Sequence, residues 1–204
     1  MTTTNRRIVM KFGGASLASP EHFENVAKIV ERQKTYFPEI VIVVSAMGKT
    51  TDELIALAKS CHPNPPRREY DMLISVGERI SMSLLAMVLS RNGFEVISFT
   101  GSQSGIITSN EHSDAKIVDI RPKRIKESLE KNKIVIVAGF QGVSLEGEIT
   151  TLGRNGSDTT AVALGSALGA EKVAFFKNVK GVYSENPHIN KDAAFHSSLT
   201  YEEA

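Results

Sequence analysis

The fold is indicated first by one stretch of the chain, Thr151-Leu-Gly-Arg-Asn-Gly-Ser-Asp-Thr-Thr-Ala-Val-Ala163. Glycines, an arginine, hydroxyls and a carboxylate stand directly before an apolar run that predicts the start of a helix. The first backbone N–H groups of a helix lack partners within it and carry the positive end of its dipole. We expect Ser157 or Asp158 to cap this helix. Gly153 and Gly156 would let the backbone approach a ligand closely. The stretch predicts an anion-binding turn, with an ordinary capped loop as the alternative.

A second segment with paired glycines follows a short apolar run near the amino end, Ile8-Val-Met-Lys-Phe-Gly-Gly-Ala-Ser16. Gly13 and Gly14 would let backbone amides approach a phosphate, and Lys11 would place a point charge on a phosphoryl group. Arg154, in the first stretch, offers a forked donor that matches a carboxylate or a phosphate. Taken alone, the segment is explained equally well by a strand followed by a turn.

Short β-branched runs alternate with longer amphipathic stretches along the chain, which is typical of a parallel sheet covered by helices on both faces. We expect strands at 7–12, 40–45, 94–99, 133–138 and 172–177, and helices at 20–36, 50–60, 69–92, 121–131 and 158–168. Residues 143–151 read as a hairpin inserted before the anion-binding turn. Ligands of such open sheets bind beyond the carboxyl ends of the strands. The residues that fall at such ends are Lys11, Ser45, Phe140 and Lys177.

The composition is that of a globular domain with 204 residues, 41% hydrophobic and 23% charged, and a net charge of +1. This near-neutral balance provides no basic field for nucleic acid. Cys61 stands alone and cannot form an internal disulfide, and the scattered histidines show no spacing for a metal site. We expect no leader segment, no apolar run long enough to span a bilayer and a cytoplasmic location. The segment Gly48-Lys-Thr50 is not a P-loop, because Val43 stands where that loop needs a glycine.

Five blocks in order give the chain a specific resemblance to the amino acid kinase family, and within it to the aspartokinases. The blocks are Lys11-Phe-Gly-Gly14; Val43-Val-Ser-Ala-Met-Gly48 with Thr50-Thr-Asp-Glu-Leu54; Leu73-Ile-Ser-Val-Gly-Glu-Arg79; Gly139-Phe-Gln-Gly142; and Gly153-Arg-Asn-Gly-Ser-Asp-Thr-Thr-Ala-Val-Ala163. Gly181-Val-Tyr183 and Tyr201-Glu-Glu-Ala204 follow them. The resemblance implies an α/β fold of the carbamate kinase type, a three-layer αβα sandwich with a mainly parallel central sheet.

The activity implied by the resemblance is ATP-dependent phosphorylation of the side-chain carboxylate of L-aspartate, the first step toward lysine, threonine and methionine. The co-substrate would be ATP with Mg²⁺. A carboxylate nucleophile is already ionised near neutral pH, so no general base is needed. Lys11 and Asp158 would be the catalytic residues. The substrate pocket would be formed by Thr51, Glu78, Phe140, Gln141, Arg154, Asn155, Gly156 and Ser157.

Two of these substrate residues have a structural alternative. Glu78 could form a surface salt bridge with Arg79 or another neighbour, and Thr51 could cap a helix that starts at Asp52. In the resemblance, Arg154 grips the α-carboxylate of aspartate and Glu78 takes its ammonium group.

The nucleotide site implied by the resemblance departs from the family pattern. Its residues would be Lys11, Phe12, Gly13, Gly14, Ser45, Lys177, Asn178, Tyr183, Asn186, Pro187 and His188. Asn178 and Asn186 stand where the family has aspartates, and Lys180, His188 and Asn155 replace an acid, an arginine and a glycine. These changes leave open a second hypothesis, an aspartate-binding regulatory protein with weakened ATP binding. A third is a sibling kinase acting on glutamate, acetylglutamate or a nucleotide monophosphate.

The resemblance covers residues 1–204 as one kinase domain. Aspartokinases continue past Tyr-Glu-Glu-Ala with further kinase-domain elements and then ligand-sensing ACT domains, so we expect the domain to be incomplete at its carboxyl end and to lack ACT domains. A homodimer is compatible with the resemblance, and no membrane partner is implied.

Overall fold

A five-stranded parallel sheet forms the centre of the molecule, which the computed structural model describes at residues 6–177, 179, 181–187, 189–200 and 202–203. In sheet order the strands are β3 (Val96–Phe99), β6 (Ile134–Ala138), β2 (Glu39–Val44), β1 (Arg7–Phe12) and β9 (Lys172–Phe176). The inner strands β6 and β2 are buried along their whole length, as expected of a parallel sheet covered on both faces. The five predicted strands are all present, with ends that shift by at most two residues.

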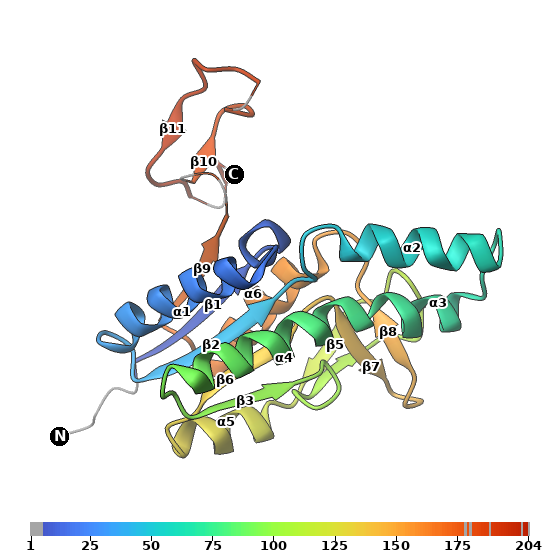
Figure 1. Cartoon of the computed structure of the whole chain (residues 1–204), viewed down its shortest axis with the longest axis horizontal. Helices are drawn as coiled ribbons and strands as arrows, with labels where there is room; N and C mark the ends of the chain where they lie inside the picture. The colour runs from blue at the N-terminus through green and yellow to red at the C-terminus, as the bar shows by residue number, and fades with distance from the viewer. Residues whose placement is uncertain (1–5, 178, 180, 188, 201, 204) are drawn as a thin grey trace.

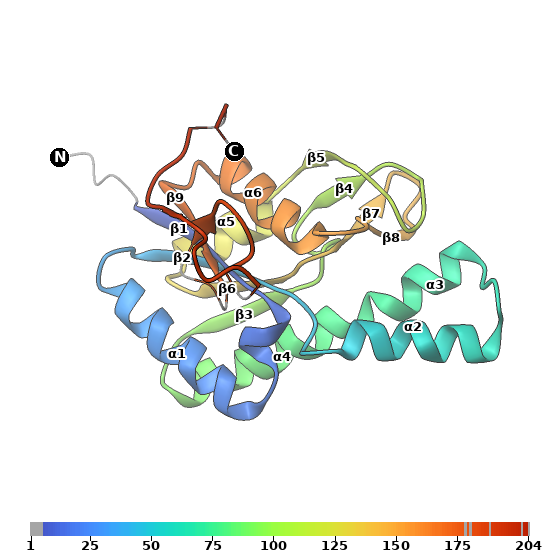
Figure 2. The ribbon, with the colours of Figure 1, turned by 90° about the horizontal axis from the view of Figure 1, so that it is seen from above.

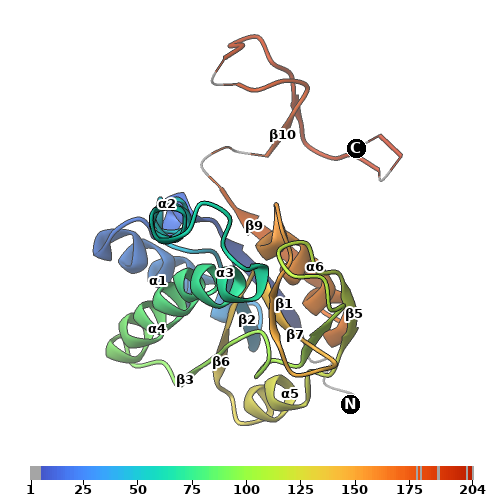
Figure 3. The same ribbon diagram turned by 90° about the vertical axis from the view of Figure 1, so that its right-hand side faces the viewer.

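Helices cover both faces of this sheet, and Figure 3 shows the three layers edge-on. One face carries α1 (Pro20–Lys34) and α4 (Val76–Arg91), and the other carries α5 (Lys123–Glu130) and α6 (Gly156–Leu168). Successive side chains of a strand point to opposite faces. In β1, therefore, Ile8, Met10 and Phe12 join the core with α1 and α4, while Val9 joins the core with α6. The predicted αβα sandwich is confirmed.

The predicted helix 69–92 is in fact two helices, α3 (Arg67–Ile74) and α4, which meet at Ser75. The carbonyl of Ser75 accepts a hydrogen bond at 2.7 Å from the side chain of Gln141, which comes from a distant strand. This tertiary contact explains why the sequence pattern did not show the break. Together with α2 (Thr50–Cys61), α3 extends beyond the layers, as Figure 2 shows.

The segment Arg67–Arg91, which includes α3 and α4, has the length and apolar composition of a helix that could cross a membrane. The expectation that no apolar run reaches this length was therefore wrong. Met82, Leu85 and Leu89 of the segment are buried in the core between α4 and the sheet. Packing in the sandwich accounts for the apolar character of these side chains.

A second sheet carries the chain from the central sheet to the arginine-containing turn. Its strands, in order, are β5 (Ile117–Ile120), β4 (Ile106–Thr108), β7 (Gln141–Ser144) and β8 (Ile149–Thr151). The antiparallel pair β7 and β8 confirms the predicted hairpin. The sequence did not predict β4 or β5, which are only three and four residues long. Such short strands owe their order to their partners, and β4 pairs with β7 across a long loop.

A short antiparallel pair follows β9 near the carboxyl end. It consists of β10 (Val182–Tyr183) and β11 (Phe195–His196), and the ring of Tyr183 packs edge-on against Phe195 with centroids 5.4 Å apart. In Figure 1 this pair stands apart from the two sheets.

Two capping predictions were wrong. Helix α6 begins at Gly156 and is preceded by Asn155 in the left-handed conformation, so Ser157 and Asp158 lie inside its first turn. Helix α2 begins at Thr50 and not at Asp52, so Thr51 lies within it as well. These side chains are free for contacts other than capping.

We predict that Leu85→Ala, in the core face of α4, lowers the free energy of unfolding by about 2–5 kcal/mol, because it leaves a cavity under the sheet. The neighbouring Leu84 is 37% exposed, whereas Leu85 is fully buried, so Leu84→Ala is a matched control with a clearly smaller loss. Urea unfolding measures both. Equal losses would contradict the assignment of Leu85 to the core.

Candidate functional site

A cleft of about 570 Å³ opens at the carboxyl ends of β1, β2 and β6. The end of β1 and the segments after β2 and β6 form its floor, and the turn before α6 forms one wall. Helices α2, α3 and α4, the loop that contains Ser113 and the end of β8 contribute the rest. This is the position that an open parallel sheet offers to ligands. The predicted site residues that line the cleft are Lys11, Gly14, Ser45, Thr51, Glu78, Phe140, Arg154, Asn155, Gly156, Ser157 and Asp158.

Lys11 and Asp158 meet in the cleft as an ion pair between β1 and α6. Lys11 Nζ lies 2.6 Å from one oxygen of Asp158, and Lys177 Nζ lies 3.0 Å from the other. Lys11 is only 6% exposed, so its charge has little contact with bulk water. Burial acts to raise the pKa of Asp158, but the hydrogen bonds and charges of the two lysines outweigh it and leave that pKa below its ordinary value. Asp158 is therefore an ionised group that holds two cations.

Glu78, from the first turn of α4, presents a buried carboxylate to the same cleft. One oxygen accepts a hydrogen bond from the backbone N–H of Ala46 at 3.1 Å, and the other has no partner among the described residues. Burial raises the pKa of Glu78 from 4.5 to about 7, against the opposing effects of the Ala46 N–H and the charge of Lys11. The surface salt bridge considered from the sequence is not formed, since Glu78 is 3% exposed. An unpartnered buried carboxylate is suited to receive a cationic group.

The turn before α6 places Arg154 at the cleft with a defined backbone. Asn155 has a φ of 58°, the left-handed conformation that asparagine tolerates well. Phe140, after β6, also has a positive φ, and its ring lies where a Cβ on Gly156 would come within 2.9 Å. Only glycine fits between Phe140 and the helix start. Arg154 is exposed and makes no hydrogen bond or ion pair with the described part of the chain, so its guanidinium is available to an anion.

The loop after β1 packs closely on the loop after β2. A Cβ on Gly14 would lie 2.8 Å from the carbonyl oxygen of Ala46, and Gly48 N donates to the carbonyl of Gly14 at 3.1 Å. Gly13 stands beside the Lys11 amine. The two glycines therefore bring backbone, and not side chains, to this edge of the cleft.

Several predicted residues do not line the cleft. Phe12 is buried in the core and stacks on Phe176 with centroids 4.6 Å apart, so only its backbone can serve a nucleotide. Gln141 is buried too, and its amide joins Ser75 to Arg79. Tyr183, Asn186 and Pro187 lie in or after β10. Asn178 and His188 fall outside the described residues.

From the sequence, we assigned no site role to a further group of cleft residues on α2, on α3, in the loop between β4 and β5, and at the end of β8, namely Ile55, Tyr70, Ile74, Ser113 and Thr151. The sequence also did not indicate the buried carboxylate of Asp71, which contacts two of them. Asp71 follows a run of charged residues at the start of α3 and resembles part of a solvated helix face, so the pattern carried no signal for its burial.

The comparison with protein families agrees with this fold and cleft. The model described as "Amino acid kinase family" matches residues 6–204, and the chain belongs to that family. Among curated relatives, the aspartokinase of Bacillus sp. (strain MGA3) is 51% identical over 96% of this chain and 48% of its own length. Aspartokinase 2 of Bacillus subtilis is 49% identical over 96% of this chain and 48% of its own. The chain thus spans about half the length of the curated relatives it matches.

Solved structures give the same result. The aspartate kinase from Synechocystis superposes with a TM-score of 0.78 and 42% identity, over 92% of this chain and 31% of that one. E. coli aspartokinase III, in complex with aspartate and ADP, superposes with a TM-score of 0.84 over 92% of this chain and 53% of its own, at 23% identity. This last likeness is one of fold.

We predict that Glu78 makes the protein less stable as the pH rises from 4.5 to about 7. The folded state holds the Glu78 proton more tightly than the unfolded state does, so the proton's contribution is present below pH 4.5 and lost as the pH passes the raised pKa. Relative to Glu78→Gln, the free energy of unfolding of the wild type should fall by about 3 kcal/mol across this window. Urea unfolding of both proteins at several pH values measures the difference, and parallel pH curves would contradict it.

Proposed function

We propose that the protein transfers the γ-phosphoryl group of ATP to the side-chain carboxylate of L-aspartate, giving 4-phospho-L-aspartate and ADP. One observation carries the proposal: a single cleft combines the Lys11–Asp158 ion pair with one carboxylate oxygen of Glu78 and the guanidinium of Arg154, which have no partners among the described residues. Relatives at about 50% identity that are named aspartokinases support this choice of substrate.

The amino acid end of the reaction is assigned to Glu78 and Arg154. Glu78 would take the ammonium group of aspartate, and the arriving positive charge would favour its ionised form. Arg154 would bind the α-carboxylate with two parallel hydrogen bonds. Thr51, Ser157, Asn155 and the backbone around Phe140 and Gln141 would complete the pocket, leaving the side-chain carboxylate directed at the phosphate.

The phosphoryl end is assigned to Lys11, which would neutralise charge on the group being transferred. An oxygen of the aspartate side chain attacks the γ-phosphorus, and the bond from that phosphorus to the β–γ bridging oxygen breaks, so the electron pair leaves with ADP. Such reactions depend on positioning and on charge stabilisation. Asp158 would orient Lys11 and Lys177 through the ion pairs described above, and Gly13 and Gly14 would line the phosphates with backbone.

Mg²⁺ would accompany ATP and help to neutralise its phosphates. Among the described residues, no group of three or more His, Cys, Asp and Glu side chains is arranged to hold a metal ion. The oxygens of Asp158 already face Lys11 and Lys177. The phosphates of ATP would therefore supply most of the ligands to Mg²⁺, and Asp158 is the candidate carboxylate from the protein.

We predict that Lys11→Met lowers kcat by about 10²-fold or more, because it removes a charge that acts on the transition state, and leaves aspartate binding largely intact. Lys172→Met makes the same change at the opposite end of the sheet, at the start of β9, and should leave kcat unchanged. A coupled ADP-release assay with calorimetry for aspartate measures both. Unchanged turnover in Lys11→Met removes this lysine from the mechanism, while aspartate binding without any wild-type turnover would favour the regulatory-protein hypothesis.

We predict that Arg154→Ala raises the KM for aspartate roughly tenfold or more, because a charge-assisted pair is lost, and changes the KM for ATP little. Arg154→Lys should recover only part of the loss, since lysine keeps the charge and lacks the fork. Equal effects on the two KM values would mean that this arginine serves the phosphates. Turnover of glutamate or a nucleotide monophosphate in preference to aspartate would indicate a sibling kinase.

A further inference from the structure

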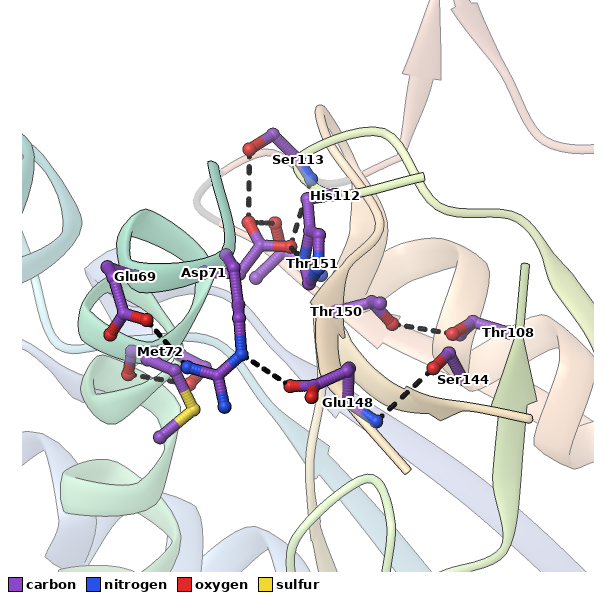
Figure 4. Close-up of polar contacts among 12 residues, drawn as sticks. Glu69, Asp71, Met72, Thr108, His112, Ser113, Ser144, Glu148, Thr150 and Thr151 are labelled. Carbon is purple, nitrogen blue, oxygen red and sulfur yellow. Dashed lines mark hydrogen bonds and ion pairs between the residues drawn. The ribbon is translucent and has the colours of Figure 1, made fainter. Parts of the chain in front are cut away.

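Asp71 of α3 is fully buried and has no role in the site described above. One oxygen accepts hydrogen bonds from the backbone N–H groups of Ser113 and Thr151, at 2.9 and 3.0 Å. The other accepts from the hydroxyls of the same two residues, at 3.1 and 2.8 Å. His112 Nδ1 lies 3.0 Å from the first oxygen, and Figure 4 shows the whole set of contacts. A buried carboxylate is costly to desolvate, and these donors compensate for that cost.

The partners of Asp71 lead directly to the arginine turn. Thr151 ends β8, and Ser113 and Thr151 both line the cleft. The chain around Ser113 also touches the turn itself, because Ala115 N donates to the carbonyl of Thr151 at 2.9 Å and a Cβ on Gly153 would lie 3.0 Å from the side chain of Asp114. One carboxylate therefore joins α3, the loop that contains Ser113 and the strand that leads into the turn.

We propose that Asp71 is a positioning residue that sets the place of Arg154 in the cleft. This inference rests on the proposed function, in which Arg154 binds the α-carboxylate of aspartate. A bidentate contact tolerates little displacement, and an error of about 1 Å in the placement of a binding group can cost a large factor in rate. Thr151 stands three positions before Arg154 in the chain. Release of its N–H and hydroxyl from Asp71 therefore frees the end of β8, the backbone that leads into the turn.

The donor set distinguishes the effect of hydrogen bonds from that of charge. Backbone N–H groups can only donate, whereas the hydroxyls of Ser113 and Thr151 can also accept. An asparagine at position 71 can therefore turn its oxygen to the two N–H groups and its NH₂ to the two hydroxyls. An alanine leaves the buried N–H of Thr151 without this acceptor. Asp71→Asn is accordingly the conservative variant that should keep the aspartate KM and the amide exchange close to those of the wild type.

The chain offers a matched control in Arg68, one helical turn before Asp71. Its Nε lies 2.7 Å from Glu148, in the turn of the β7–β8 hairpin, so it also links α3 to that hairpin. The link is exposed and involves no residue of the cleft, and exposed pairs contribute little. Arg68→Ala removes a connection between α3 and the β7–β8 hairpin and leaves the contacts of Thr151 at the end of β8 intact.

The test compares Asp71→Ala, Asp71→Asn and Arg68→Ala with the wild type, by steady-state kinetics and by hydrogen exchange at the amides of Ser113 and Thr151. We expect Asp71→Ala to raise the aspartate KM roughly tenfold, with ATP KM changed less than about twofold, and to speed exchange at both amides roughly tenfold. Asp71→Asn should lie close to the wild type, and Arg68→Ala should match it. If Asp71→Ala does not fold, Ser113→Ala and Thr151→Val each remove one hydroxyl donor and should each raise the aspartate KM several-fold.

The two readouts separate this proposal from the proposed function. Faster amide exchange with an unchanged aspartate KM, or a similar rise in both KM values, overturns the positioning role. Unchanged exchange at both amides would show that the hydrogen bonds from Asp71 do not hold the backbone of Ser113 and Thr151, and it also overturns the proposal. A wild-type protein that neither binds nor phosphorylates aspartate contradicts the proposed function. In that case, hydrogen exchange at the amides of Ser113 and Thr151 still reports whether Asp71 holds the turn in place.

Discussion

The ion pair between Lys11 and Asp158 is the contact on which the site depends. It joins the carboxyl end of strand β1 to the first turn of α6, with Lys11 Nζ 2.6 Å from an oxygen of Asp158. Each residue would be costly to bury without the other, because a desolvated charge requires a partner. The pair therefore fixes both segments around one cleft, and Lys177 at the end of β9 adds a second cation to the same carboxylate. Three chain segments distant in sequence meet at one charge.

The positions of the other cleft groups follow from the layers of the fold. Alternation along β1 sends Phe12 into the core beneath α1 and leaves Lys11 on the face of α6. Helix α4 carries Glu78 at its start, where the Ala46 N–H meets one oxygen and leaves the other without a partner among the described residues. The second sheet returns the chain to the arginine turn. The turn that carries Arg154 and the buried carboxylate of Glu78 thus face one space, which is the arrangement that the proposed binding of a zwitterionic amino acid would use.

The elements of the sandwich could be predicted because their patterns are local. Strand runs such as 7–12 and helices such as 20–36 differ from the structure by only a residue or two. The exceptions arise where a distant contact overrides the pattern. The side-chain amide of Gln141 donates to the carbonyl of Ser75 where a predicted helix divides, and β4 is a strand because β5 and β7 pair with it on either side. Caps also depended on context, since Asp158 pairs with lysines instead of closing its own helix.

The sequence by itself determined the chemistry of the cleft: which lysine, arginine, glutamate and aspartate stand next to turns and strand ends, and which glycines allow the backbone to close. The tertiary structure decided their state and their partners. Burial among other segments raises the pKa of Glu78, and the hydrogen bonds of Asp71 come from residues 42 and 80 positions away. Spacing along a chain specifies local conformation, whereas desolvation and long-range donors exist only once the layers have packed.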